Sequence, residues 1–276
     1  MSALAIPFWT WLLLGAVAGL LGGSFLTVLV SRGPVLWKLV DPPEGGLPRP
    51  YSLALPRSHC PACRTQLSMI DLIPILGYLR ARGQCRHCGV SIPRRYLLIE
   101  LAGGLAGLLA AAVFTAPLIA LHALVVLLVL LALGVIDHRT GYLPDALTLP
   151  LIGLGFAAAL VPFYVSLMAA LIGAAIGYGL LWGISTGYRA LRGQEGLGLG
   201  DAKLVAALGA LVGIYALPFV ILLASASALA IAMIFAKTAG GFSAQTEIRF
   251  GPYLAGAGAA VFLWSHAFPL WSPWLS

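Results

Sequence analysis

Charged side chains are scarce in this sequence. Only 9% of its 276 residues are Asp, Glu, Lys or Arg, whereas 61% are apolar. A soluble domain has about 25% charged residues, so these few charges cannot cover the surface of a water-soluble globule of this size. The composition also excludes intrinsic disorder, because disordered chains are poor in apolar residues. A membrane protein with several spans remains.

Long stretches without charge indicate where the spans lie. A membrane helix needs about 20 apolar residues, and residues 1–31 form one such stretch. This stretch lacks a basic start and is too long for a signal peptide, so we interpret it as a retained span. Three later stretches are each too long for one crossing, and we predict two helices in each. They are 96–136 (if Glu100 is tolerated), 146–188 and 204–236, with breaks at Thr115-Ala116-Pro117, near Pro162 and at Pro218. A last span over about 252–270 completes a prediction of eight transmembrane helices in an all-α protein.

The basic residues predict the orientation in the membrane. The net charge of +7 would suggest nucleic-acid binding in a soluble protein. With eight spans, however, all 16 Lys and Arg fall on one side. The positive-inside rule makes that side cytoplasmic, so both termini are expected to face outward and no nucleic-acid partner is expected. Ten of these residues lie in 32–95, and the others are Arg139, Arg189, Arg192, Lys203, Lys237 and Arg249.

Cysteine is confined to the polar segment 32–95. The only four cysteines form two Cys-x-x-Cys pairs, Cys60/Cys63 and Cys85/Cys88. Two such pairs can offer four thiolates to one tetrahedral ion, which predicts a structural zinc site. Disulfides are disfavoured in a reducing cytoplasm, and a redox dithiol would need only one pair. His59 and His87 flank the cysteines and could be alternative ligands, although each is more simply interpreted as a solvated loop histidine. We therefore predict three parts: the first transmembrane helix over 1–31, a small cytoplasmic zinc domain over 32–95, and a seven-helix membrane core over 96–276.

Acidic residues are rarer still, with nine in the chain. Asp137 and Asp201 both fall at the predicted cytoplasmic boundary, where a carboxylate calls for an explanation. Two adjacent carboxylates can share one proton and supply both a base and an acid, as in aspartic proteases. Gly198 and Gly200 would permit the backbone or a substrate strand to approach Asp201 closely.

Simpler interpretations of these acids stay open. Asp201 stands where a helix N-cap belongs, and Asp137 could pair with Arg139. Asp145 competes with Asp137 for the first acidic role, although its place after Pro144 favours an N-cap. Lys203 could tune the charge of Asp201 or extend its amine to the lipid headgroups. From the acids and cysteines alone, a metal-handling membrane transporter or a non-catalytic zinc adaptor are also possible.

Motifs spread over nearly the whole chain support a family resemblance. They are Gly23-Ser24-Phe25-Leu26 with Arg32, the two cysteine segments 57–63 and 82–88, Arg95-Tyr96 with Glu100, Ile136-Asp137 through Leu143-Pro144-Asp145, Gly198-Leu199-Gly200-Asp201-Ala202-Lys203-Leu204, and Phe250-Gly251-Pro252-Tyr253-Leu254. With these motifs in this order, the chain resembles the bacterial type IV prepilin peptidases (prepilin leader peptidase/N-methyltransferases), which are GxGD membrane aspartyl proteases.

This resemblance implies a function and a site. Such enzymes lie in the bacterial inner membrane and cut the leader from type IV prepilins or type II secretion pseudopilins at the cytoplasmic face. Asp137 and Asp201 would be the catalytic pair, supported by Gly198, Gly200 and Lys203. Many members also methylate the new N-terminus with S-adenosylmethionine. The chain departs from the family pattern at Thr27 and Leu72, where Asn is usual, and at Arg249, where Pro is common. The first two departures bear on methylation.

Overall fold

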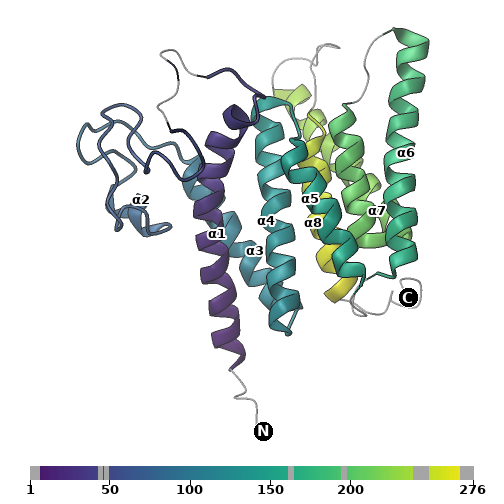
Figure 1. Cartoon of the computed structure of the whole chain (residues 1–276), viewed down its shortest axis with the longest axis horizontal. Coiled ribbons are helices and arrows are strands. Elements are labelled where there is room, and N and C mark those ends of the chain that lie inside the picture. Colours follow the sequence, from purple (N-terminus) through teal and green to yellow (C-terminus); the bar gives the residue numbers. More distant parts are fainter. Residues whose placement is uncertain are drawn as a thin grey trace. The chain divides into compact units, whose positions relative to one another are not determined.

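The structure is a computed structural model, and it describes residues 7–42, 46, 50–160, 165–193, 198–238 and 249–267. These residues form eight helices and contain no β-strand, as the all-α prediction requires (Figure 1). The helices are α1 (Phe8–Leu36), α2 (Leu76–Arg80), α3 (Arg95–Val113), α4 (Pro117–Thr140), α5 (Asp145–Ala159), α6 (Leu167–Arg192), α7 (Leu199–Thr238) and α8 (Gly251–Ala267).

Two compact units make up the chain, Met1–Leu128 and Val129–Ser276. The first unit contains α1, the cysteine segments, α2 and α3. The second contains α5, α6, α7 and α8, and the division between the units falls inside α4. The three-part division drawn from the sequence stays a prediction.

Five helices in the described part of the chain are long and apolar enough to cross a membrane, namely α1, α3, α4, α6 and α7. The apolar helices α5 and α8 are shorter, with 15 and 17 residues. The structure therefore confirms a polytopic helical protein, whereas the number of crossings stays a prediction.

One of the predicted helix breaks is found where the sequence placed it, and another is found at a different residue. The break at 115–117 is confirmed, because α3 ends at Val113 and α4 begins at Pro117. Pro162 lies outside the described residues. The break assigned to Pro218 is wrong in position: non-helical angles occur at Gly213, with φ 74° and ψ 173°, and Pro218 lies inside the second half of α7. Glycine reaches this positive φ without the Cβ clash that other residues would meet.

Glycines let the helices of the first unit approach closely. A Cβ at Gly19 of α1 would stand 2.2 Å from the Gly103 carbonyl oxygen of α3, and a Cβ at Gly107 would stand 2.0 Å from the Gly15 oxygen. Small residues every fourth position are a common packing device in membrane helices, where no hydrophobic effect drives helices together. The indole of Trp11 adds a hydrogen bond of 2.9 Å to the Ala111 carbonyl of α3.

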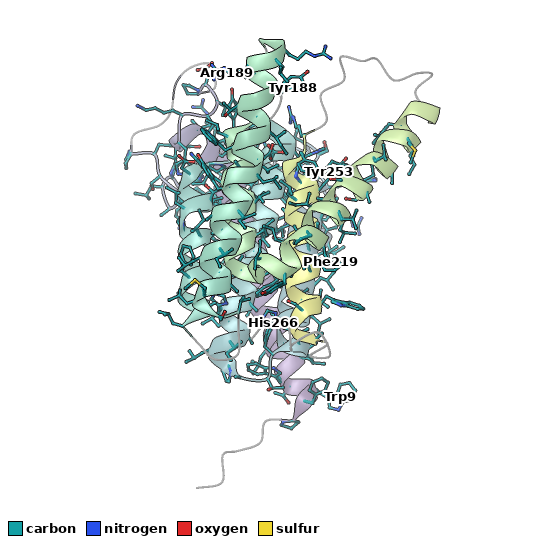
Figure 2. The ribbon with its side chains drawn as sticks, turned by 90° about the vertical axis from the view of Figure 1, so that its right-hand side faces the viewer. Trp9, Tyr188, Arg189, Phe219, Tyr253 and His266 are labelled. Carbon is teal, nitrogen blue, oxygen red and sulfur yellow. The ribbon has the colours of Figure 1, made fainter. Side chains whose placement is uncertain are left out.

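The second unit is packed in the same way around the first half of α7. A Cβ at Gly209 of α7 would stand 2.2 Å from the Gly173 oxygen of α6, and one at Gly155 of α5 would stand 2.7 Å from the Ala210 Cβ. The first half of α7 is almost wholly buried, as a central helix must be. Figure 2 shows Tyr188 and Arg189 toward one end of this unit, with His266 of α8 toward the other.

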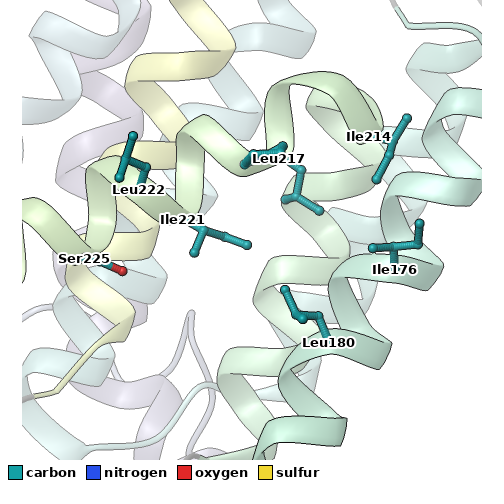
Figure 3. A pocket seen from close by; sticks show the side chains of 8 residues that line it. Ile176, Leu180, Ile214, Leu217, Ile221, Leu222 and Ser225 are labelled. Carbon is teal, nitrogen blue, oxygen red and sulfur yellow. The ribbon is translucent and has the colours of Figure 1, made fainter.

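An apolar pocket lies between α6 and the part of α7 that follows Gly213. Its volume is about 390 Å³, and it is lined by Ile176, Leu180, Ile214, Leu217, Pro218, Ile221, Leu222 and Ser225 (Figure 3). No Asp, Glu, His, Lys or Arg takes part in this lining. The pocket therefore offers no acid–base chemistry, and the acids of the second unit must be considered separately.

Candidate active site and metal centre

Two aspartates are brought together within the second unit. Asp137 lies one turn before the end of α4, and Asp201 lies in the first turn of α7. Their carboxylates are close enough for the negative charges to repel each other. An acid at Asp201 is also favoured by the positive end of the helix dipole. The interpretation of Asp201 as the N-cap is wrong, because the helix has already begun at Leu199.

Among the acids in the described part of the chain, Asp137 is the only one that is buried. Only 5% of its surface is exposed, and its Oδ2 has no hydrogen-bond partner among the described residues. Buried polar atoms are almost always paired, so an unpaired carboxylate oxygen calls for an explanation such as a water or a bound group. The Gly251 amide interacts with the Asp137 carboxyl group, and the unpaired oxygen can accept a further hydrogen bond from a polar group that enters the site.

The start of α8 closes one side of this site. A Cβ on Gly251 would lie 2.6 Å from Asp137 Oδ2, so any larger residue would displace the carboxylate. The guanidinium of Arg249 donates hydrogen bonds to the carbonyl oxygens of Asp137 and His138. A cation at these last carbonyls stabilises the C-terminal end of α4.

The segment before Asp201 is equally tight. The Asp201 amide donates to the Gly198 carbonyl over 3.1 Å. A Cβ on Gly200 would lie 3.0 Å from the Cβ of Leu143, so glycine lets the loop between α4 and α5 rest on this turn. At Gly198 a Cβ would meet nothing closer than Asp201 Oδ2 at 3.8 Å, so sterics alone do not require glycine there.

Asp145 has a partner that the sequence did not reveal. Lys203 Nζ donates to both of its carboxylate oxygens, over 2.6 Å and 2.8 Å. The N-cap interpretation of Asp145 is wrong: Pro144 occupies the cap position of α5, and no side chain caps the helix. Asp145 and Lys203 nevertheless lie near the site in the chain. Asp145 is two residues after Leu143, and Lys203 is two residues after Asp201.

The first unit brings the four cysteines together. All four Sγ atoms lie within 4.8 Å of one another, with Cys60 3.8 Å from Cys88 and Cys63 3.9 Å from Cys85. An ion with four sulfur ligands at about 2.3 Å places the sulfurs about 3.8 Å apart. The cluster therefore has the size and donor set to hold a metal ion such as zinc. The hydroxyl and backbone of Thr65 lower the pKa of the Cys63 thiol to about 6, which favours the ligating thiolate.

The two cysteine pairs stand on equivalent turns. The Cys60 amide bonds to the Thr65 carbonyl as the Cys85 amide bonds to the Val90 carbonyl. The residue after each pair, Arg64 or Gly89, has a positive φ of 56° or 71°. The two turns thus have similar backbone conformations and each offers two thiols, which suits one shared ion.

Two polar side chains, one on α1 and one on α3, form hydrogen bonds with the segment that contains the cysteines. Their partners were not predicted from the sequence. Glu100 of α3 accepts the Ile75 amide over 2.8 Å, at the start of α2. Arg32 of α1 donates to the Pro56 carbonyl over 2.7 Å and to the Ser52 carbonyl over 3.0 Å. The presence of Arg32 and Glu100 in the family motifs was the only available signal.

Comparisons with known proteins agree with these features. Residues 17–114 match the family described as Bacterial Peptidase A24 N-terminal domain, and residues 124–233 match the Type IV leader peptidase family. The chain is 42% identical to a prepilin leader peptidase/N-methyltransferase of Burkholderia pseudomallei, over 96% of this chain and 89% of that protein. Proteins of the same name from Dickeya chrysanthemi and Neisseria gonorrhoeae are 41% and 39% identical, over 93% and 95% of this chain and 95% and 91% of theirs.

No solved structure matches the chain. The two family matches lie in order along the sequence, and the similarity to the relatives extends over nearly their whole length. The chain therefore belongs to the type IV prepilin leader peptidase family.

Proposed function

We propose that this chain is a membrane aspartyl endopeptidase that removes the leader of type IV prepilins or type II secretion pseudopilins at the cytoplasmic face of the inner membrane. One observation carries the assignment of its active site: a buried Asp137 oxygen without a partner lies beside a second aspartate, Asp201. In a chain of this family, that arrangement supports Asp137 and Asp201 as the catalytic pair.

Two carboxyl groups that lie near enough to influence each other suit peptide hydrolysis. One carboxylate removes a proton from a water molecule while the water oxygen attacks the scissile carbonyl carbon. The other carboxyl group, protonated, donates its proton as the carbonyl oxygen becomes negative. When the C–N bond breaks, the first carboxyl group gives its proton to the leaving amine nitrogen. The second takes a proton back from a hydroxyl group of the tetrahedral intermediate, so the pair returns to its starting state.

The substrate fits the position of the site along the helices. Asp137 is near the last residue of α4, and Asp201 is near the first residue of α7. A helix end at the membrane boundary can meet a leader that lies in water while the apolar helix of the pilin stays in the bilayer. The basic residues of the chain support a cytoplasmic position for this boundary.

Zinc and S-adenosylmethionine are the expected cofactors. Cys60, Cys63, Cys85 and Cys88 would hold the zinc ion, which would stabilise the folded cysteine region. With four protein ligands such an ion has no position for substrate, so its role is structural. The names of the relatives support N-methylation of the new N-terminus, with S-adenosylmethionine as the methyl donor.

The transporter and the zinc adaptor are less favoured alternatives. The cysteine region and the aspartates belong to different compact units, and an ion path would need to connect them. An adaptor would have no use for a buried carboxylate oxygen without a partner. Neither alternative accounts for the family to which the chain belongs.

Cleavage of a prepilin by the reconstituted full chain tests the proposal. Asp137→Asn and Asp201→Asn should each abolish leader loss, read by mass, because an amide can neither take nor give the proton. Both variants should still insert into membranes and retain about one zinc ion per chain, which serves as the folding control. Full cleavage by either variant would remove that residue from the catalytic pair. Adding S-adenosylmethionine to the same assay reads methyl gain separately.

A further inference from the structure

The ion pair between Asp145 and Lys203 joins the two chain segments that carry the candidate catalytic acids. Asp145 opens α5, eight residues after Asp137, and Lys203 lies two residues after Asp201. The pair spans 58 residues of sequence with two short bonds, 2.6 Å and 2.8 Å. We propose that this ion pair is a latch that sets the position of Asp201 relative to Asp137. The proposal rests on the catalytic pair assigned above.

Hydrogen bonds restrain the first part of the chain between Asp137 and Asp145, as far as Tyr142. The Gly141 amide donates to the Asp137 carbonyl over 2.8 Å, in a turn where Gly141 has a φ of 74°. The Thr140 hydroxyl donates to the Ile136 carbonyl over 2.9 Å and accepts the Tyr142 amide over 3.2 Å. The end of α4 is thus tied by hydrogen bonds to the loop that leads into α5.

The other side of the latch is fixed by packing. Leu143 in this loop lies against Gly200, where even one added methyl group would stand 3.0 Å from the Leu143 Cβ. The Leu143 contact and the Lys203 bond therefore hold the first turn of α7 from both sides of Asp201. Inside α7, Ala202, Leu204 and Val205 are buried, so this turn is set firmly in the unit.

Lys203 acts through the backbone in this arrangement. Residues two apart on a helix point about 200° away from each other, so Lys203 and Asp201 leave α7 on different faces. Neither Asp145 nor Lys203 takes part in the chemistry, and both are positioning residues. Their side chains are 56% and 31% exposed, and exposed ion pairs contribute little to overall stability. This pair can instead affect catalysis by setting the position of Asp201. A displacement of about 1 Å in a catalytic group can reduce the rate of reaction about a hundredfold.

Charge reversal in the full chain, reconstituted in lipid vesicles, tests the latch. Asp145→Lys and Lys203→Asp should each lower kcat for leader cleavage about ten- to a hundredfold, with KM within about twofold. The double variant, which restores an opposite-charge pair, should recover most of the lost kcat. Asp145→Asn and Lys203→Gln give the same comparison without introducing repulsion, should the reversals fail to fold. Arg192→Gln is a matched control that removes a basic residue from the end of α6, and it should keep the kcat of the unaltered chain.

Three results would overturn the latch. One is unchanged kcat in all the single variants. Another is a double variant as slow as the single ones. The third is a loss of activity that follows the loss of folded protein, with the kcat of the folded fraction unchanged. Asp137→Asn and Asp201→Asn separate the two proposals: if both are inactive while the latch variants are fully active, only the latch fails. Cleavage by those two variants would instead remove the catalytic pair on which the latch rests.

Discussion

At the scale of single residues, the two cysteine turns place different residues in the same conformation. Arg64 and Gly89 each follow the second cysteine of a pair, and both have a positive φ. A residue with a Cβ pays about 1–2 kcal/mol for this conformation, whereas glycine does not. No atom lies within 4 Å of a Cβ placed on Gly89, so backbone strain would be the only cost of a side chain there.

This difference predicts opposite outcomes for two substitutions. Gly89→Ala should weaken the cysteine region by about 1 kcal/mol, which makes removal of its metal by a chelator about fivefold easier. Arg64→Gly should leave metal retention unchanged or improved, because it removes the same strain. Competition with a chromophoric chelator on the full chain measures both. Equal losses in the two variants would show that the left-handed conformations do not govern the stability of these turns.

At the scale of helices, glycine decides which faces of α6 can touch α7. Gly173 faces α7, and a Cβ there would stand 2.5 Å from the Gly209 carbonyl oxygen. Gly179 lies on the same helix with nothing within 4 Å. Both substitutions by alanine gain the same helix propensity, up to about 1 kcal/mol. Any difference between them therefore reports the contact between the helices.

Gly173→Ala should lower the thermal midpoint of the detergent-solubilised chain by several degrees, because overpacking costs about 1–3 kcal/mol and exceeds the gain in propensity. Gly179→Ala on α6 should leave the midpoint unchanged or raise it slightly. A scan of both variants under one set of detergent conditions gives the comparison. If Gly173→Ala were as stable as Gly179→Ala, the close approach of α6 and α7 would be incorrect.

At the scale of the whole molecule, charge is the property that predicts orientation. All 16 basic residues fall on one predicted side, and the opposite connections carry none. Basic residues are retained on the cytoplasmic side during insertion. We therefore expect the basic surplus to set the topology, and a nucleic-acid surface is not needed to explain it.

Tags in the intact membrane test this orientation. We expect tags at the N-terminus and at the C-terminus to react with a membrane-impermeant reagent in spheroplasts, because both ends should face outward. A tag inserted after Pro42 should react only when the membrane is permeabilised, since that loop should be cytoplasmic. Reaction of the two ends on opposite sides would mean an odd number of crossings and would require a new assignment of the spans.

Much of the molecule can be predicted from the sequence, because the relevant signals are local. Charge-free runs predicted apolar helices, and a proline after Thr115-Ala116 marked the turn between α3 and α4. The regular spacing of the cysteines predicted their cluster, since each Cys-x-x-Cys turn orients two thiols by itself. The scarcity of acids then reduced the candidates for catalysis to a few carboxylates.

The sequence by itself determined the helical membrane class, the four-cysteine set and the choice of candidate acids. Tertiary structure decided which distant groups meet: Gly251 and Arg249 at Asp137, and Lys203 at Asp145. Tertiary structure also decided where α7 is interrupted: the break lies at Gly213, whereas the sequence predicted it at Pro218. The physical reason is that helix formation depends on neighbours in the chain, whereas these contacts depend on how helices far apart in sequence pack. Because glycine reaches a positive φ without a Cβ clash, the chain can turn at Gly213 where that packing requires it.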